Sequence, residues 1–246
     1  MKLKLCIILF ISFSCICNAA FENIDIGARP MGMAGAYAAV ADDVNAIVWN
    51  PAGISKIKSR QIGLNYLELY GMVNYNFLSF VNPLEQSNVI AGYIISSNDS
   101  EHLYRETTFG FSYAREIYQY FKFGSNLKLL SSEANIGEIS IGSSKGMAID
   151  VGVCINLIDE ISFGVSLPNL LSYVAYKRNE LKRASEKDYT EKLTREYRIA
   201  IACRSNWLNQ RLSGTKYASD TQLVAEVANN CLLYTSPSPR DLSTSR

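Results

Sequence analysis

The chain has 246 residues, a formal net charge of +1, and a composition that is 48% hydrophobic and 11% aromatic. This length suits one sizeable domain, and the near-neutral charge gives no support for nucleic acid as a partner. The mean hydropathy of +0.01 fits a soluble protein, but it also fits a membrane β-barrel, in which only every second strand residue faces lipid.

The first twenty residues have the pattern of a secretory signal. Two lysines precede an apolar run over 5–17, and small or polar residues follow it (Lys2, Lys4; Asn18, Ala19, Ala20). The alternative is an anchoring helix, but the run is shorter than the roughly 20 apolar residues that a membrane-spanning helix needs. We therefore predict that 1–20 is a signal peptide and that the mature chain starts near Ala20 or Phe21.

The cysteines and the last sixteen residues carry no predicted function. Three of the six cysteines (Cys6, Cys15, Cys17) lie in the predicted signal, and the others have no metal-ligand or disulfide spacing. No metal site or cofactor is therefore expected. The segment 231–246 loses all alternation and is rich in Ser, Pro and Arg. It is either a flexible native tail or, as we favour, translated adapter sequence, in which case the natural protein continues differently.

From about residue 61 the apolar residues recur with a period of two. Over 147–157 the odd-numbered residues are apolar, while the even-numbered residues are small or polar. The same alternation occurs over 121–129 and 161–167, and less regularly in several other segments. Because successive side chains of a strand point to opposite faces, each segment predicts a strand with one apolar and one polar or small face.

Both a soluble sandwich and a membrane barrel have such strands, and three features favour an antiparallel transmembrane β-barrel. The segments run to roughly 9–11 residues, the length that crosses a bilayer. The polar face is rich in Gly, Ser, Asn and Lys, which suits a lumen, and aromatic residues gather near strand ends. Three charged residues are candidates for the lumen face, where they are expected to pair with one another: Lys128, Glu133 and Asp150.

The predicted connections alternate between long and short. Long ones are expected over 97–106, 131–145 and 177–196, and short ones around 116–120 and 158–160. We count about nine strands, whereas bacterial barrels close with an even number. No terminal aromatic strand follows Asn230, so the predicted barrel over 61–230 is a partial one.

The segment 27–55 is rich in glycine and alanine and ends in an Asn-Pro turn. Its glycine spacing matches no phosphate-binding loop. Its charges and proline (Arg29, Pro30, Asp42, Asp43) interrupt any membrane-spanning helix. We predict a short amphipathic helix over 31–41, packed closely against the inside of the wall. Asp42 and Asp43 are expected to cap that helix or to bond to polar groups of the wall, and Asn50-Pro51 to turn the chain into the first strand.

This segment resembles the N-terminal signature of the PorV/PorQ-like proteins, which belong to the FadL-like superfamily of outer-membrane barrels. The resemblance rests on Ala28-Arg29, on GMAGA over 32–36 (with Ala34 where glycine is usual), on Ala41-Asp42-Asp43 and on WNPAG over 49–53. It implies a barrel of about fourteen strands with an N-terminal plug segment, here 21–60. The signature residues are Gly27, Arg29, Gly32, Gly35, Asp42, Asp43, Trp49, Asn50, Pro51 and Gly53.

The resemblance implies two possible functions in the outer membrane of a Gram-negative-type bacterium. FadL-like members carry hydrophobic compounds such as long-chain fatty acids, and PorV-like members are partner subunits in protein secretion. We expect passive transport of hydrophobic small molecules, with a protein-binding secretion partner as the alternative. The expected partners are thus outer-membrane lipid and either a hydrophobic small molecule or a secreted protein. An enzyme is not expected, because His102 is the single histidine and has no nucleophile at motif spacing.

Overall fold

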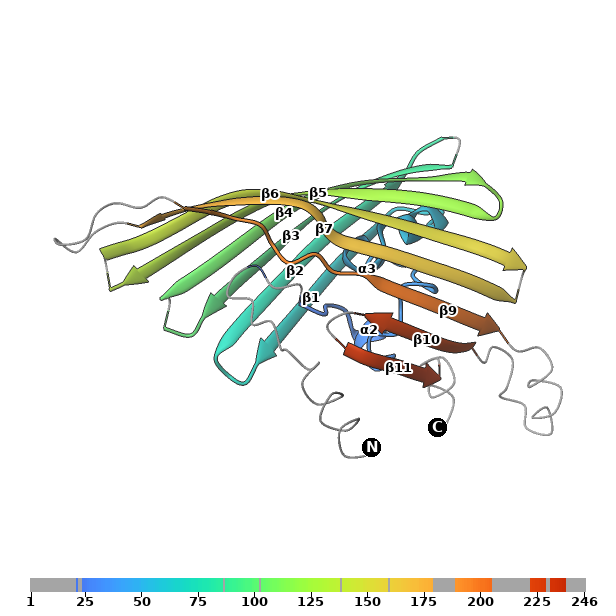
Figure 1. The fold of residues 1–246 in the computed structure, drawn as a ribbon, viewed down its shortest axis with the longest axis horizontal. Helices are drawn as coiled ribbons and strands as arrows, with labels where there is room; N and C mark the ends of the chain where they lie inside the picture. Colours follow the sequence, from blue (N-terminus) through green and yellow to red (C-terminus); the bar gives the residue numbers. More distant parts are fainter. Residues whose placement is uncertain are drawn as a thin grey trace, which may run out of the picture.

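A computed structural model describes residues 21, 24–85, 87–101, 103–137, 139–158, 160–178, 189–204, 222–228 and 231–237. The predicted signal peptide, His102 and half of the charged stretch 177–196 (179–188) lie outside these residues. Figure 1 shows a broad curved sheet with the N-terminal elements on one side of it.

The sheet is an antiparallel meander of eleven strands, in which each strand pairs with the next except that the short β8 pairs with β7 alone. Its strands are β1 (Gln61–Leu69), β2 (Val73–Pro83), β3 (Asn88–Asp99), β4 (Tyr104–Tyr118), β5 (Phe121–Ile136), β6 (Ile139–Ile158), β7 (Ile161–Arg178), β8 (Tyr189–Glu191), β9 (Arg198–Arg204), β10 (Gln222–Ala228) and β11 (Cys231–Pro237). Within the described residues, β1 and β11 are the two ends of the sheet and do not pair with each other. The predicted all-β antiparallel architecture is confirmed.

The two faces of the sheet differ as the alternation predicts. Large apolar side chains on the convex face are exposed, such as Leu64 (77%), Phe111 (60%) and Met147 (53%). On the concave face, small and polar side chains such as Asn126 and Ser166 are buried. An apolar outer face with a polar or small inner face is the arrangement of a membrane barrel, because its exterior faces hydrocarbon.

The central strands are longer than predicted. β5, β6 and β7 have 16, 20 and 18 residues, and the long connections expected over 97–106 and 131–145 are mostly strand. Ladder hydrogen bonds need no apolar side chains, so the Ser-rich ends of these strands continue the sheet without a hydropathy signal. At about 3.4 Å per residue, twenty residues exceed the thickness of the roughly 30 Å hydrocarbon core, so these ends project beyond it.

The structure also extends the sheet into the first residues of the predicted tail. Residues 231–237, assigned from composition to a tail without regular structure, form β11 and pair with β10. The turn between β1 and β2 is tight: Tyr70 and Gly71 have positive φ, 55° and 69°, as in the primed turns that join antiparallel strands.

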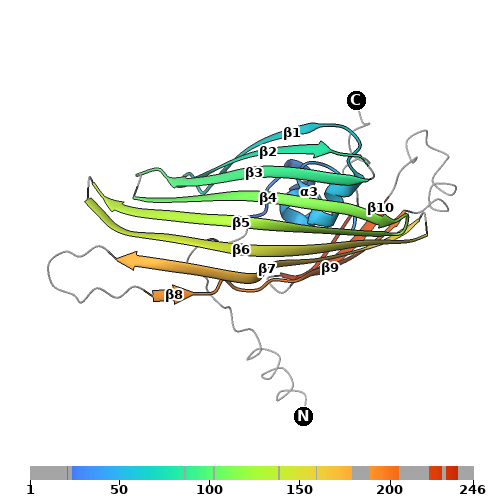
Figure 2. The same ribbon diagram turned by 90° about the horizontal axis from the view of Figure 1, so that it is seen from above.

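The concave face is covered by residues 24–57, which we call the plug (Figure 2). The plug contains α2 (Ala28–Gly32), α3 (Ala46–Trp49) and the 3-10 helix η1 (Pro51–Lys56). The helix predicted over 31–41 does not form, because α2 ends at Gly32 and the chain then takes positive φ at Ala34 (51°) and Gly35 (82°). No helix among the described residues is long and apolar enough to cross a membrane.

Candidate functional site: the interface between plug and wall

The plug meets the wall on a group of glycines from three neighbouring strands. Gly124 of β5 lies opposite Gly152 of β6 in the register, and Cys154 of β6 lies opposite Gly164 of β7. A Cβ atom at Gly152 would lie 2.2 Å from Asn50 Oδ1, one at Gly124 2.4 Å from the Pro51 carbonyl carbon, and one at Gly164 2.2 Å from Ala38 O. Since real Cβ atoms do not approach so closely, only glycine at these positions leaves room for the plug.

Asn50 is the polar link between this glycine surface and the plug. It is fully buried, and its Nδ2 donates to Ala38 O at 2.8 Å within the plug and to Val153 O at 3.1 Å on β6. Its Oδ1 accepts from the Ala52 N–H at 3.2 Å, which caps η1. The predicted turn at Asn50-Pro51 therefore begins a 3-10 helix, and the first strand starts only at Gln61.

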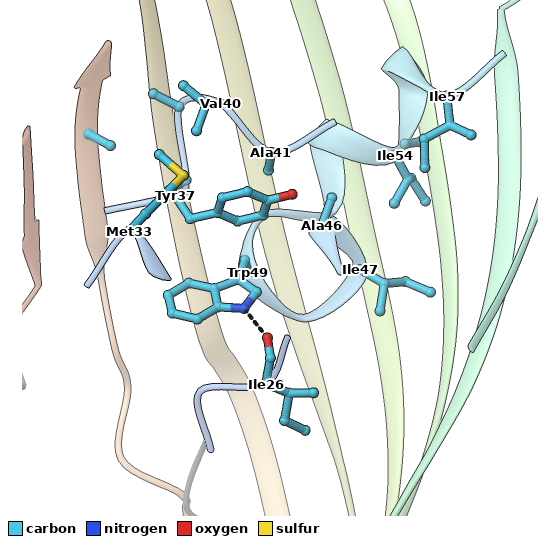
Figure 3. Packing of buried hydrophobic residues seen from close by; sticks show 14 of the residues in the cluster. Ile26, Met33, Tyr37, Val40, Ala41, Ala46, Ile47, Trp49, Ile54 and Ile57 are labelled. Atoms are coloured by element: carbon cyan, nitrogen blue, oxygen red, sulfur yellow. Dashed lines mark hydrogen bonds between the residues drawn. The ribbon is translucent and has the colours of Figure 1, made fainter. Parts of the chain in front are cut away.

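The other signature residues hold the plug in its own shape. Trp49 and Tyr37 pack edge to face with ring centroids 5.9 Å apart, and Trp49 Nε1 donates to Ile26 O at 2.8 Å (Figure 3). A Cβ at Gly27, where φ is 106°, would lie 2.7 Å from Asn45 Cγ, and one at Gly53 would lie 2.6 Å from Ala41 O. Gly27 and Gly53 thus permit close backbone packing within the plug.

Arg29, Asp42 and Asp43 form an ion-pair cluster inside the plug. Arg29 Nη1 donates to Asp42 Oδ1 and, at 3.1 Å, to Asp43 Oδ2. The acidic pair thus bonds to Arg29, and Asp43 also accepts from the Asn45 N–H at 2.8 Å, so the expectation that the pair caps a helix over 31–41 or bonds to the wall was wrong. Burial, followed by the charge of Asp43, raises the pKa of Tyr37, so its hydroxyl stays protonated beside this cluster.

Glu226 of β10 binds the plug backbone from another part of the sheet. Its carboxylate is buried, and Oε2 accepts from the backbone N–H groups of Tyr37 at 2.9 Å and Ala38 at 2.8 Å. Arg198 of β9 lies close by, with its guanidinium carbon 4.3 Å from the Trp49 ring centroid and Nη2 3.2 Å from Asp25 Oδ1. The sequence analysis missed both residues; the available signals were a glutamate within the apolar run of β10 and an arginine directly before that of β9.

Two of the three predicted lumen residues meet on the concave face. Lys128 Nζ lies 2.8 Å from Asp150 Oδ1 and donates to Asn169 Oδ1 at 2.6 Å. Asp150 Oδ1 also accepts from the Asn169 N–H at 2.8 Å. The buried pair is thus hydrogen-bonded on both sides, which compensates the cost of removing its charges from water.

Glu133, the third predicted lumen residue, lies on the other face. Its side chain is exposed, whereas the flanking Ser132 is buried. Since side chains on a strand alternate, Glu133 has the opposite parity to Lys128 and points outward. The prediction that it faces the lumen was wrong.

One cavity beside the plug, lined by described residues, is small. It has a volume of about 50 Å³ and is lined by apolar residues and by the charged residues Asp25, Glu106, Lys128, Asp150 and Arg198. Sites for small ligands are usually about 300–1,000 Å³, so this cavity suits a few water molecules but not a fatty acid. Among the described residues, no group of His, Cys, Asp and Glu side chains is arranged to hold a metal ion.

Comparisons with known proteins relate the chain to outer-membrane barrels. The sequence model of the family described as "Type IX secretion system membrane protein PorP/SprF" matches residues 43–235. No curated protein matches the sequence. Among solved structures, the CymD monoaromatic hydrocarbon channel has a similar fold, with a TM-score of 0.54 and 12% sequence identity over 85% of this chain and 69% of the channel.

These comparisons confirm the predicted outer-membrane barrel but do not test its assignment to the PorV/PorQ-like proteins. An outer-membrane β-barrel of a secretion-linked family is confirmed. The family match begins at Asp43, so it leaves out five of the ten signature residues, and the PorV/PorQ-like and FadL-like assignments stay predictions.

Proposed function

This chain belongs to the PorP/SprF family of type IX secretion system membrane proteins, and from that premise we propose that it is a protein-binding partner barrel for export to the cell surface. The protein lies in the outer membrane. The proposal reverses the order of preference that the sequence alone gave, because transport of hydrophobic small molecules was then the first expectation.

The observation that carries the proposal is the filled interior. The plug backbone lies directly on the wall at Gly124 and Gly164. Buried hydrogen bonds from Asn50, Asn126 and Glu226 hold it there. The cavity beside the plug, about 50 Å³, is too small for a lipid-sized molecule, whereas a role that uses the surfaces of the barrel needs no passage.

The projecting ends of β4–β7 offer a surface for a protein partner. The hairpin between β5 and β6 carries Ile136 and Ile139, each 59% exposed. These residues lie at the far end of strands too long for the hydrocarbon core, so their exposure is not explained by lipid. Apolar residues at such a position favour contact with protein.

Deleting the gene and measuring proteins at the cell surface tests the proposal. We expect surface biotinylation to show loss of one or more secreted proteins in the deletion strain, and recovery when the full-length gene is restored. A photo-crosslinking residue at Ile136 should capture such a secreted protein, while the same residue at the lipid-facing Leu129 should not. An unchanged surface proteome would contradict the proposal.

A passive conduit for hydrophobic compounds is the second candidate. The fold shared with a monoaromatic hydrocarbon channel favours it, but the plug would have to move to open a route. Uptake of labelled fatty acid or toluene by cells with and without the protein distinguishes the two functions, and equal uptake would count against the conduit.

A further inference from the structure

Phe21 is anchored inside the barrel. Its side chain is 7% exposed and packs with Leu130, Ala148 and Val174, which come from three different strands. It lines the same cavity as Glu106 of β4 and the Lys128–Asp150 pair. An aromatic ring held this way on the concave face fixes the chain that leads into the plug.

The backbone nitrogen of Phe21 faces an acid. It donates to Glu106 Oε1 at 3.0 Å, and Glu106 also accepts from the Tyr104 hydroxyl at 2.7 Å. The cations described around this cavity already have acidic partners, since Lys128 pairs with Asp150 and Arg198 with Asp25. The described donors to the Glu106 carboxylate are thus an amide N–H and a phenol, both neutral. A cation in the same place would stabilise the carboxylate more strongly.

The predicted signal peptide, residues 1–20 (the leader), ends directly before Phe21, whose nitrogen makes this contact. We propose that removal of the leader creates an α-ammonium group, on Ala20 or Phe21, which Glu106 holds as counter-ion while the Phe21 ring anchors the new N-terminus in the barrel. The structure places the Phe21 nitrogen itself 3.0 Å from Glu106 Oε1, so cleavage before Phe21 would leave the new amine at this carboxylate.

The chemistry of this step balances with water alone. Water adds across the peptide bond before Ala20 or Phe21. The carbonyl carbon of the leader takes the hydroxyl and becomes a carboxylate, and the nitrogen of the mature chain takes a proton and becomes an amine. Near pH 7 an α-amine is mostly protonated, so cleavage converts a neutral amide contact into a charge-assisted one, which is about twice as strong.

The first test is the N-terminus itself. The protein is expressed with its leader, purified from outer membranes and analysed by N-terminal sequencing and intact mass. We expect a mature chain that begins at Ala20 or Phe21 with a free α-amine. A chain that keeps its leader, or that begins after Phe21, overturns the proposal.

The second test asks whether Glu106 holds the amine. In outer membranes at pH 7.5, an acetylating reagent is added and acetylation of the N-terminal peptide is followed by mass spectrometry. Glu106→Gln keeps an acceptor oxygen but removes the charge, so we expect labelling to speed up about tenfold. The matched control Glu133→Gln removes an outward-facing acid of the neighbouring strand and should leave the rate unchanged.

A further variant keeps the proposal testable if Glu106→Gln does not assemble. Phe21→Ala leaves Glu106 intact but removes the anchoring ring, and it should also speed up labelling. Equal labelling rates in the wild type and in every variant that assembles would overturn the proposal, because the amine would then be free in water.

Discussion

The wall and the plug are stabilised in different ways, although both are made largely of small and apolar residues. The wall consists of hairpins whose backbone groups pair with the next strand, so its contacts are local in sequence. The plug has little regular structure, and its backbone groups bond to side chains far away in the chain: Glu226 lies 189 residues after Tyr37. A wall position therefore tolerates change on its outer face, whereas a position between plug and wall does not.

The largest expected effect comes from breaking the buried ion pair. Lys128→Met leaves Asp150 buried without its cation, and the loss of one partner of such a pair costs about 3–5 kcal/mol. Urea unfolding of the refolded protein in lipid vesicles measures this as a lower free energy of unfolding. The double variant Lys128→Met with Asp150→Leu should recover part of the loss; if it recovers none, the pair does not act as a unit.

Crowding the glycine surface comes next. Gly152→Ala places a methyl group against Asn50 Oδ1, and overpacking of this kind costs about 1–3 kcal/mol. The matched control is Gly92→Ala on β3, where a Cβ would meet its nearest neighbour, Gly110 O, at an ordinary 3.7 Å. Protease resistance of the plug should fall for Gly152→Ala alone. The same resistance in both variants would contradict the close approach of Asn50.

Removing the Asn50 side chain has a smaller expected effect. Asn50→Ala removes the amide donor of the buried Ala38 carbonyl and leaves it the weaker Cys154 thiol, which should cost about 1–2 kcal/mol in the free energy of unfolding. Asn74→Ala is the control, because Asn74 makes one exposed contact, with the Tyr66 hydroxyl, and should be near neutral. Equal losses from the two substitutions would show that Asn50 does not link plug and wall.

The smallest effect is expected on the outer face. Glu133→Gln should change the free energy of unfolding by less than about 0.5 kcal/mol, since exposed charges contribute little. The same urea titration checks it. If Glu133→Gln lowered the free energy of unfolding as much as Lys128→Met, Glu133 would have to face the lumen, contrary to its exposed position in the structure.

The comparison also explains what could be predicted from the sequence. Period-two alternation over 121–129, 147–157 and 161–167 located the first part of β5, the second half of β6 and the first part of β7, together with the lipid-facing side, because a bilayer imposes that pattern on each strand separately. The ends of β5 and β6 were missed because ladder hydrogen bonds leave no mark on hydropathy. Glu133 was misplaced because its segment was interpreted as a connection, where parity has no meaning.

The plug was harder to predict because its contacts are long-range. A resemblance in the signature identified Trp49, Asn50 and Pro51, and the small residues of 27–55 correctly indicated close packing. Nothing in the local pattern indicated that Ala34 takes positive φ, or that Gly124, Gly152 and Gly164 lie side by side. Those relations exist only once three strands are in register.

Spin labels at single cysteines of the two faces test the central claim most directly, which is that apolar side chains face lipid while the plug fills the interior. In vesicles, labels at Phe109 and Phe111 should be relaxed by oxygen dissolved in the lipid, and labels at Ser112 and Ser166 should be shielded from both oxygen and a water-soluble nickel chelate. If the chelate reaches Ser112 and Ser166, the interior is open; if oxygen reaches both faces equally, the wall is not a lipid-facing barrel.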